Sequence, residues 1–180
     1  MKILIVYDSY FGNTKQVAEA IGEALYLQGS VELCRAPDVA LEQLIGVNLL
    51  IVGSPTRAFR ATKAIDRFLD SIPTGGLQGV KVLAFDTRIS AVETSSRLLN
   101  VLAALFGCAA GPIGEKLKQK GGELLAPPEG FFVTDSEGPL KGDELQRAAE
   151  WVLRALDVPS HPGTMQHHRN ETIRQTPFPC

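Results

Sequence analysis

Short apolar runs alternate with amphipathic stretches along most of this chain. Runs rich in Ile, Leu and Val that stop at small or polar residues are typical of buried β-strands. The runs that predict strands are residues 2–7, 31–35, 49–53, 81–85 and 123–126, the last continuing after a Pro-Pro break into 131–133. Strands separated by helical segments usually form a parallel sheet that is covered on both faces. The pattern therefore predicts an α/β fold with five parallel strands.

The segments between these runs carry apolar residues at helical spacing. In the first of them, Val17, Ile21 and Leu25 recur every four residues, so one face of a helix would be apolar. The segments that predict helices are residues 13–27, 41–45, 63–69, 109–120 and 142–156. Trp151, the only tryptophan, falls within the last helix and is interpreted as a packing residue.

The stretch from residue 85 to residue 123 is long for a single crossover connection. Its apolar part, residues 97–106, predicts an additional helix. The sequence leaves open whether that helix is a lid, a partner surface or plain packing. The same segment could be buried within the chain or form the interface of a homodimer.

Length and charge narrow the class of protein. A chain of 180 residues suits one well-filled domain, which we expect at residues 1–157, followed by a mobile polar tail at 158–180. The net charge of −2 provides no basic field for binding nucleic acid. The first apolar run is too short for a signal-peptide core, and no segment approaches the roughly 18 apolar residues of a membrane span. We therefore expect a cytoplasmic protein with no membrane or nucleic-acid partner.

The cysteines and histidines do not predict a metal site. Cys34, Cys108 and Cys180 are scattered and form no CxxC pair. The three histidines all lie in the polar tail, where such side chains are usually solvated. No metal is expected.

The first predicted strand ends in a cluster of small hydrogen-bonding residues, D-S-Y-F-G-N-T at residues 8–14. Gly12 allows a tight turn, and the helix that follows begins with unpaired N–H groups at the positive end of its dipole. With the hydroxyls of Ser9 and Thr14 and the amide of Asn13, such a turn can hold a phosphate without a Lys or Arg. The alternative is that Ser9 and Asn13 merely cap the helix. The patterns GxGxxG and GxxxxGK[ST], typical of other phosphate loops, are absent from the sequence.

Four features together resemble the flavodoxin family. They are S-x-x-G-N-T after K-I-L-I-V-Y, the five alternating strand and helix units, G-S-P-T-R after the third strand, and L-A-P-P-E-G-F-F-V before the last helix. The resemblance covers residues 1–157. It implies a three-layer, doubly wound, five-stranded parallel sheet in the order 2-1-3-4-5, with FMN as the cofactor.

The resemblance also implies three segments around the flavin. The FMN phosphate would lie in the first, on Ser9, the N–H of Phe11, Gly12, Asn13 and Thr14, and Tyr10 in the same segment would also bind the cofactor. The second segment is Ser54, Pro55, Thr56, Arg57, Ala58 and Phe59. The third is a loop at the end of the fourth strand, with Asp86, Thr87 and Arg88 followed by Ile89. Phe11 stands where many flavodoxins have a hydroxyl residue, so backbone donors would make that contact.

Two departures from the family pattern bear on the chemistry. The third segment has no aromatic residue to stack on the flavin and only Phe59 is aromatic nearby, so one flavin face would stay open to a hydride donor or a quinone. No glycine lies between Ser54 and Thr74. One-electron carriers of the family typically use a glycine there to flip a peptide toward the half-reduced flavin. A positive φ would be costly at Arg57 or Ala58.

Three arginines, Arg57, Arg60 and Arg88, fall in the two segments expected to border the flavin ring. A cation near the ring would stabilise the anionic reduced flavin and raise its potential. The alternative is that each arginine forms a surface ion pair with a nearby acid.

These observations leave three functions open. The first is an FMN-binding electron carrier that serves a redox partner protein, favoured by the single domain without a recognisable nicotinamide site. The second is an FMN-dependent two-electron oxidoreductase acting on quinones or similar small-molecule electron acceptors, since P-T-R also resembles the second loop of flavodoxin-like quinone reductases. The third is an FMN-free binding module with the flavodoxin fold. No catalytic residue is predicted, because a flavin itself supplies the redox chemistry.

Overall fold

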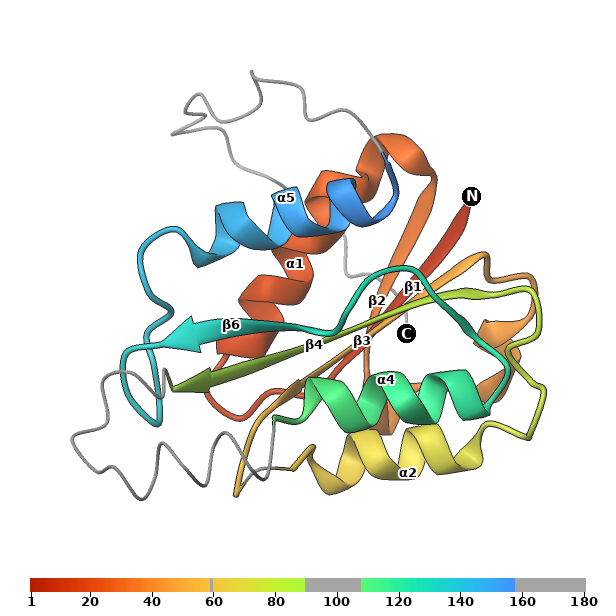
Figure 1. Cartoon of the computed structure of the whole chain (residues 1–180), viewed down its shortest axis with the longest axis horizontal. Helices are drawn as coiled ribbons and strands as arrows, with labels where there is room; N and C mark the ends of the chain where they lie inside the picture. The colour runs from red at the N-terminus through yellow and green to blue at the C-terminus, as the bar shows by residue number, and fades with distance from the viewer. Residues whose placement is uncertain (59, 90–107, 158–180) are drawn as a thin grey trace.

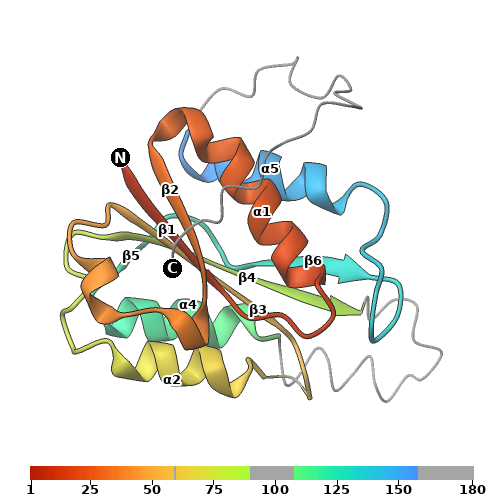
Figure 2. The ribbon, with the colours of Figure 1, turned by 180° about the vertical axis from the view of Figure 1, so that it is seen from behind.

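A central parallel sheet separates two pairs of helices in the computed structural model, which describes residues 1–58, 60–89 and 108–157 (Figure 1). Helices α1 and α5 cover one face, and α2 and α4 cover the other, as the view from behind also shows (Figure 2). The three-layer α/β architecture is thus confirmed. The helix expected at residues 97–106 and the tail expected at 158–180 lie outside the described residues.

The sheet has the expected strand order. Strands β1 (Lys2–Tyr7), β2 (Ser30–Arg35), β3 (Leu49–Pro55) and β4 (Lys81–Ile89) are ordered β2-β1-β3-β4, and all their pairings are parallel. The last position is shared by two short strands, β5 (Glu123–Leu124) and β6 (Glu129–Val133), which both pair with β4. The order 2-1-3-4-5 is confirmed, although the fifth strand is divided in two.

The helices begin close to the predicted positions. They are α1 (Asn13–Leu25), α2 (Lys63–Ser71), α4 (Ala110–Gln119) and α5 (Glu144–Ala155). Short 3-10 turns occupy Tyr26–Gln28, Ala36–Asp38 and Leu41–Leu44. The first helix is therefore shorter than the predicted 13–27, and the short helix predicted at 41–45 is a 3-10 turn. Among the described residues, no helix has the length and apolar character needed to span a membrane.

Each face of the sheet packs into its own core. Along β1, Leu4 and Val6 join the core under α2 and α4, whereas Ile3 and Ile5 join the core under α1 and α5. This alternation follows from the period of two along a strand. All four are fully buried, which explains why the strand reads as a continuous apolar run.

Trp151 is a packing residue, as predicted. It lies in the core under α5, with its ring edge-on to Phe131 at a centroid separation of 6.0 Å. Phe131 in turn packs edge-on against Phe85 at 5.9 Å. Such aromatic pairs add about 0.5–1.5 kcal/mol each beyond the area they bury.

Strand β4 is longer than the sequence predicted. The apolar run stops at Phe85, but the strand continues to Ile89, because β3 and β6 pair with it on both sides. Asp86 lies beside Ser54 on β3 and beside Gly130 on β6. The third segment, predicted as a loop, is therefore held in the sheet.

The outer edge of β6 is closed by hydrogen bonds within the chain. The Gly130 N–H donates to the Glu129 carboxylate at 2.9 Å, and the Gly130 carbonyl accepts from the Arg147 guanidinium. The Phe132 N–H donates to Glu144 Oε2 at 2.8 Å, and the Phe132 carbonyl accepts from the backbone N–H at residue 141 at 2.9 Å. All four outward groups of these two strand residues have partners.

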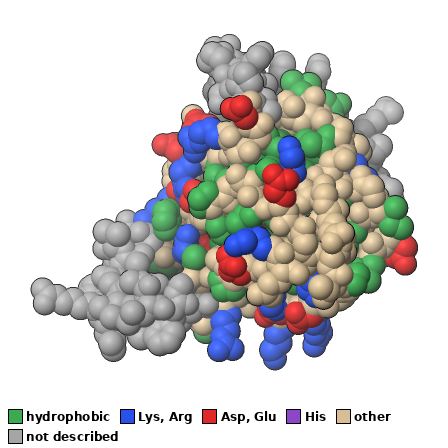
Figure 3. All heavy atoms as spheres, turned by 45° about the vertical axis from the view of Figure 1, so that its right-hand side comes forward, with side chains coloured by type: hydrophobic (Ala, Val, Ile, Leu, Met, Phe, Trp, Pro, Cys, Tyr) green, Lys and Arg blue, Asp and Glu red, His purple; other side chains and the backbone are tan. Residues whose placement is uncertain are grey.

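Charges of both signs are mixed on the surface. On the face shown in Figure 3, Lys and Arg side chains are interspersed with Asp and Glu side chains and with scattered apolar ones. This mixture is in keeping with the near balance of 18 basic and 20 acidic residues in the sequence.

Candidate functional site

A cavity lies at the carboxyl ends of β1, β3 and β4, where four separate segments of the described chain meet. The residues that line it are Ser9, Tyr10, Phe11, Asn13, Thr14, Pro55, Thr56, Arg57, Thr87, Arg88, Ile89, Val133 and Ser136. Since the chain leaves β1 for β2 on one side while β3 lies on the other, this is the topological switch point of the sheet. Ligands of open α/β sheets bind at such points.

The first segment presents an uncapped helix terminus. Gly12, the N-cap residue of α1, has φ +88°, and no side chain caps the helix. The first turn also contains no acidic residue. Because the first N–H groups of an α-helix have no partner within the helix, this end of α1 can bind an anion.

Neither Ser9 nor Asn13 caps α1, which answers the alternative raised by the sequence. The Ser9 hydroxyl accepts from the Gly12 N–H at 3.1 Å and so closes the loop before the helix. The Asn13 amide donates to the Glu137 carbonyl at 2.9 Å and fastens the loop after β6 to α1. The Ser9 hydroxyl retains its own proton to donate.

A buried carboxylate lies behind this loop. Asp8 Oδ1 accepts from the Ser9 N–H at 2.9 Å and from Arg35 Nη2 at 3.0 Å. The hydrogen bond to Asp8 raises the pKa of the Arg35 guanidinium. The arginine thereby balances a negative charge next to the anion-binding helix end.

Two exposed aromatic rings form the rim of the cavity. Tyr10 is 57% exposed and Phe11 is 47% exposed. The Arg57 guanidinium carbon lies 5.1 Å from the centroid of the Tyr10 ring and 5.8 Å from that of Phe11. The sequence analysis placed both residues in the first segment but expected only Phe59 as an aromatic near the ring, and Phe59 lies outside the described residues.

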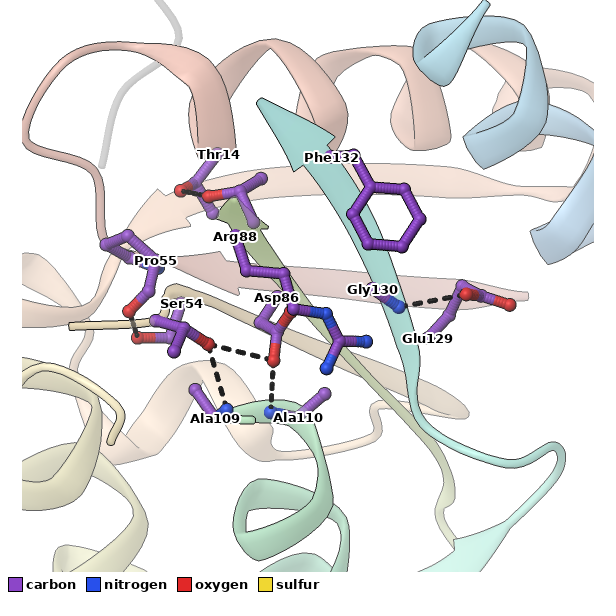
Figure 4. A network of polar contacts seen from close by, with 12 residues as sticks. Thr14, Ser54, Pro55, Asp86, Arg88, Ala109, Ala110, Glu129, Gly130 and Phe132 are labelled. Atoms are coloured by element: carbon purple, nitrogen blue, oxygen red, sulfur yellow. Dashed lines mark hydrogen bonds and ion pairs between the residues drawn. The ribbon is translucent and has the colours of Figure 1, made fainter. Parts of the chain in front are cut away.

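Asp86 joins the second and third segments from behind the cavity. Its side chain is fully buried, and Oδ2 accepts from the Thr56 hydroxyl at 3.0 Å and from the Ala110 N–H at 2.9 Å (Figure 4). The Thr56 hydroxyl in turn accepts from the Ala109 N–H at 2.9 Å. The carboxylate thus ties the second segment to the start of α4.

The pKa of Asp86 reflects this burial. Loss of solvation raises the pKa of the carboxyl above its ordinary value. The Arg88 charge, the Ala110 N–H, the Thr56 hydroxyl and the Cys108 thiol act in the opposite direction.

Comparison with known proteins identifies the family. The flavodoxin family model matches residues 5–151. The chain belongs to the flavodoxin family.

A flavodoxin from Aquifex aeolicus (strain VF5) is 27% identical over 169 residues, which make up 87% of this chain and 89% of that protein. A solved flavodoxin from the domain Archaea aligns with a TM-score of 0.64 and 25% identity, over 87% of this chain and 97% of the other. The oxidised Flavodoxin 2 from Bacillus cereus aligns with a TM-score of 0.65 and 21% identity, over 87% and 99% of the two chains. The likeness to Flavodoxin 2, at 21% identity, supports the fold alone.

As a flavodoxin, the chain binds FMN. The site fits this cofactor on its own geometry. The uncapped end of α1 suits a phosphate, and the Ser9 hydroxyl is beside it. Thr56, directly after β3, and Thr87 in β4 line another part of the cavity, where a planar ring can lie against the strand ends. The bound FMN supplies the redox chemistry, and the protein binds and orients it.

The residues that the sequence predicted for this flavodoxin site, apart from Phe59, which lies outside the described residues, divide into two groups. Those that the structure brings together around the cavity are Ser9, Tyr10, Phe11, Asn13, Thr14, Pro55, Thr56, Arg57, Thr87 and Arg88. Gly12, Ser54, Ala58 and Asp86 are described but do not line it. Gly12 forms the turn. The Ser54 hydroxyl accepts from the Thr62 N–H at 3.0 Å and supports the entry to α2.

Ala58 has φ +45° and is exposed. A positive φ was expected to be costly at this position, yet Ala58 adopts one. The turn is closed by Arg57 and Arg60, whose backbone N–H and carbonyl groups bond each other at 3.0 Å in both directions. These two bonds hold the turn in its left-handed conformation.

Two residues that line the cavity could not be found from the sequence. Val133 and Ser136 come from the end of β6 and the turn after it, whereas Ile89 ends the third segment as predicted. The Asn13 side chain holds that turn at the site through its hydrogen bond to the Glu137 carbonyl. The sequence D-S-E-G-P at residues 135–139 indicates a loop, but it does not indicate where in the fold that loop lies.

Proposed function

We propose that this flavodoxin is an electron carrier that exchanges electrons between bound FMN and a redox partner protein at the cavity rim. The observation that supports it is the uncapped end of α1, which opens into a cavity bordered by β3 and β4. An anion-binding helix end that opens into a cavity at the strand ends suits a planar cofactor that carries a phosphate. The exposed rings of Tyr10 and Phe11 leave apolar surface at the rim, where a partner could dock.

Each part of the site has a distinct task in this proposal. The N–H groups at the start of α1 bind the FMN phosphate, and the Ser9 hydroxyl donates to it. Pro55 and Thr56 border the ring from the second segment, and Thr87 borders it from β4. Asp8 is a buried carboxylate beside the position that we propose for the phosphate, and its ion pair with Arg35 offsets its negative charge.

Titration of the flavin-free protein with FMN and with riboflavin tests the binding half of the proposal. We expect FMN to bind more tightly than riboflavin, because only FMN carries the phosphate. Equal affinities would contradict the phosphate site. No binding of either flavin would contradict the proposed function and favour an FMN-free binding module.

Stepwise reduction of the FMN complex, followed by absorption, tests the carrier half. Accumulation of the half-reduced flavin supports one-electron transfer to a partner protein. Direct conversion from oxidised to fully reduced flavin contradicts the carrier proposal and moves the assignment to the second candidate below.

The second candidate is a two-electron oxidoreductase that acts on quinones or similar acceptors. Two observations favour it. Arg57 lines the cavity, so positive charge borders the position proposed for the reduced ring. The residues of β4 that line the cavity, Thr87 to Ile89, include no aromatic side chain to cover the flavin. Oxidation of NADH or NADPH coupled to a quinone acceptor would support this candidate, and its absence would favour the carrier.

A further inference from the structure

The guanidinium of Arg88 is partly buried and lies against an acidic residue of its own strand. Its Nε lies 3.2 Å from Asp86 Oδ1, and the arginine side chain is 28% exposed (Figure 4). The pair is a charge contact without an aligned hydrogen bond, since Oδ1 has no hydrogen-bond partner in the described part of the chain. From the sequence, the expected partner of Arg88 was either the flavin ring or a surface acid. Asp86, two residues earlier on the same strand, is neither.

Space for this guanidinium comes from a missing side chain on β6. Gly130 pairs with Asp86 across the two strands. A Cβ added to Gly130 would lie 1.7 Å from Arg88 Nη2 and 2.3 Å from its Cζ and Nε. The guanidinium therefore occupies the volume that any other residue at position 130 would fill. The ring of Phe132 lies beyond it, 5.9 Å from the guanidinium carbon.

We propose that Gly130 is a positioning residue that keeps the Arg88 charge paired with Asp86, and so limits the affinity for reduced FMN. This inference rests on the proposed function, since it concerns the flavin that the cavity holds. Arg88 lines the cavity, so a guanidinium displaced from Asp86 would carry an unpaired charge beside that cavity. A cation there would stabilise the anionic reduced ring more than the neutral oxidised ring.

The first experiment uses the flavin-free protein and measures the pKa of Asp86 by carboxyl carbon NMR. The groups that face this carboxylate are Arg88 on β4, the Thr56 hydroxyl after β3, and the Cys108 thiol and Ala110 N–H at the start of α4. Beyond Gly130 on β6, Glu129 is itself paired with Arg147. Of these, Arg88 is the cation in contact with Asp86.

In Gly130→Ala the guanidinium must leave Asp86, so we expect the pKa of Asp86 to rise. Arg88→Gln should give a similar rise, and the double variant should show no additional one. Gly111→Ala is the matched control, because a Cβ on Gly111 in α4 meets nothing within 4 Å. An unchanged pKa in Gly130→Ala would overturn the proposed placement of Arg88.

The second experiment measures the affinities of reduced and oxidised FMN. We expect Gly130→Ala to raise the ratio of these affinities about tenfold, which corresponds to about 30 mV for a two-electron couple. The rise should disappear when Arg88→Gln is the background, and Gly111→Ala should show none. A pKa shift without a change in this ratio would overturn the link to the flavin. Failure of the parent protein to bind FMN would contradict the proposed function instead, and the NMR titration would still decide the placement of Arg88.

Asp86→Asn provides a second route if Gly130→Ala does not fold. It removes the partner of Arg88 but leaves the space on β6. If Asp86 restrains Arg88, then Arg88→Gln should lower the affinity ratio more in the Asp86→Asn background than in the parent protein. Equal effects in both backgrounds would overturn the proposal.

Discussion

The hydroxyl oxygens of Thr14 and Thr87 lie 2.8 Å apart, although 73 residues separate them in the chain. Thr14 is in the first turn of α1 and Thr87 is in β4, and both are buried. This single hydrogen bond joins the segment that we propose for the FMN phosphate to the strand that we propose to border the ring (Figure 4). The two halves of the site are thereby held at a fixed separation before FMN binds.

Loss of one hydroxyl from this pair should destabilise the fold. Thr14→Val leaves the Thr87 hydroxyl buried without its partner, so we expect the free energy of unfolding to fall by about 1–3 kcal/mol. The double variant Thr14→Val with Thr87→Val leaves no unpaired hydroxyl and should lose less than the sum of the two single variants. Urea unfolding of the flavin-free protein measures both. Strict additivity would mean that the contact contributes nothing.

Ser9 should distinguish FMN from riboflavin. Ser9→Ala removes the donor to the phosphate and leaves the ring contacts intact, so we expect FMN affinity to fall about tenfold, the value of one charge-assisted hydrogen bond. Riboflavin affinity should change little. Ser71→Ala in α2, where the hydroxyl donates to the Phe68 carbonyl, is a control remote from the cavity. Equal losses for both flavins would place Ser9 at the ring instead.

Arg57 should raise the flavin midpoint potential if its charge reaches the ring. Arg57 is exposed and lies on the rim rings of Tyr10 and Phe11, so solvent weakens its field. We expect Arg57→Gln to lower the two-electron midpoint potential by about 30 mV or less. Arg60→Gln, which removes an equal charge that does not line the cavity, should have a smaller effect. Equal shifts in midpoint potential for the two variants would mean that Arg57 acts only through its long-range charge and does not border the ring.

Asp86 should make stability depend on pH in an unusual direction. Burial raises its pKa in the folded protein, whereas an unfolded Asp titrates near about 3.9. The folded state then binds this proton more tightly, so stability falls as pH rises from the unfolded pKa to the folded one. Asp86→Asn has no such titration. Its free energy of unfolding, measured in urea at several pH values, should therefore improve relative to the parent as pH rises through that window. A constant difference between the two proteins would contradict the raised pKa.

Ala58 should be a site where glycine stabilises the protein. Its left-handed backbone costs an L-residue about 1–2 kcal/mol, and the extra freedom of glycine in the unfolded chain offsets about 0.4–1 kcal/mol of the gain. We expect Ala58→Gly to raise the free energy of unfolding by about 0.5–1 kcal/mol. Ala61→Gly, at a position without positive φ, should lower it. Loss of stability in both variants would mean that position 58 is not strained.

The apolar runs predicted the sheet because its strands are buried on both faces and contain little else. They failed at Asp86 and Arg88, where the strand continues through charged residues. These two charges pair with each other, and the carboxylate also accepts from Thr56 and from the start of α4. Partners so far apart in sequence leave no local pattern, so the end of β4 could not be found from its own residues.

The candidate site was predictable where it depends on local backbone chemistry. Gly12 and the polar residues around it indicate an anion-binding turn from sequence alone. The contributions of Val133 and Ser136 depend on where the loop after β6 folds back, which a contact 124 residues away decides. The Gly130 space for Arg88 is likewise a cross-strand effect. The sequence motifs around Gly12 were enough to predict the ligand. The distribution of charge around the site depends on tertiary contacts, which the motifs do not contain.

The closed outer edge of β6 has a consequence for how copies of this chain meet. An open strand edge offers a row of free donors and acceptors to which another chain can add a strand, and this is a common start of aggregation. At Gly130 and Phe132 all four such groups are already bound, by Glu129, Arg147, Glu144 and the backbone of residue 141. A second copy therefore finds no template along these two residues. Substitutions of Glu144 or Arg147 would uncover one, so their first effect would be on self-association at high concentration.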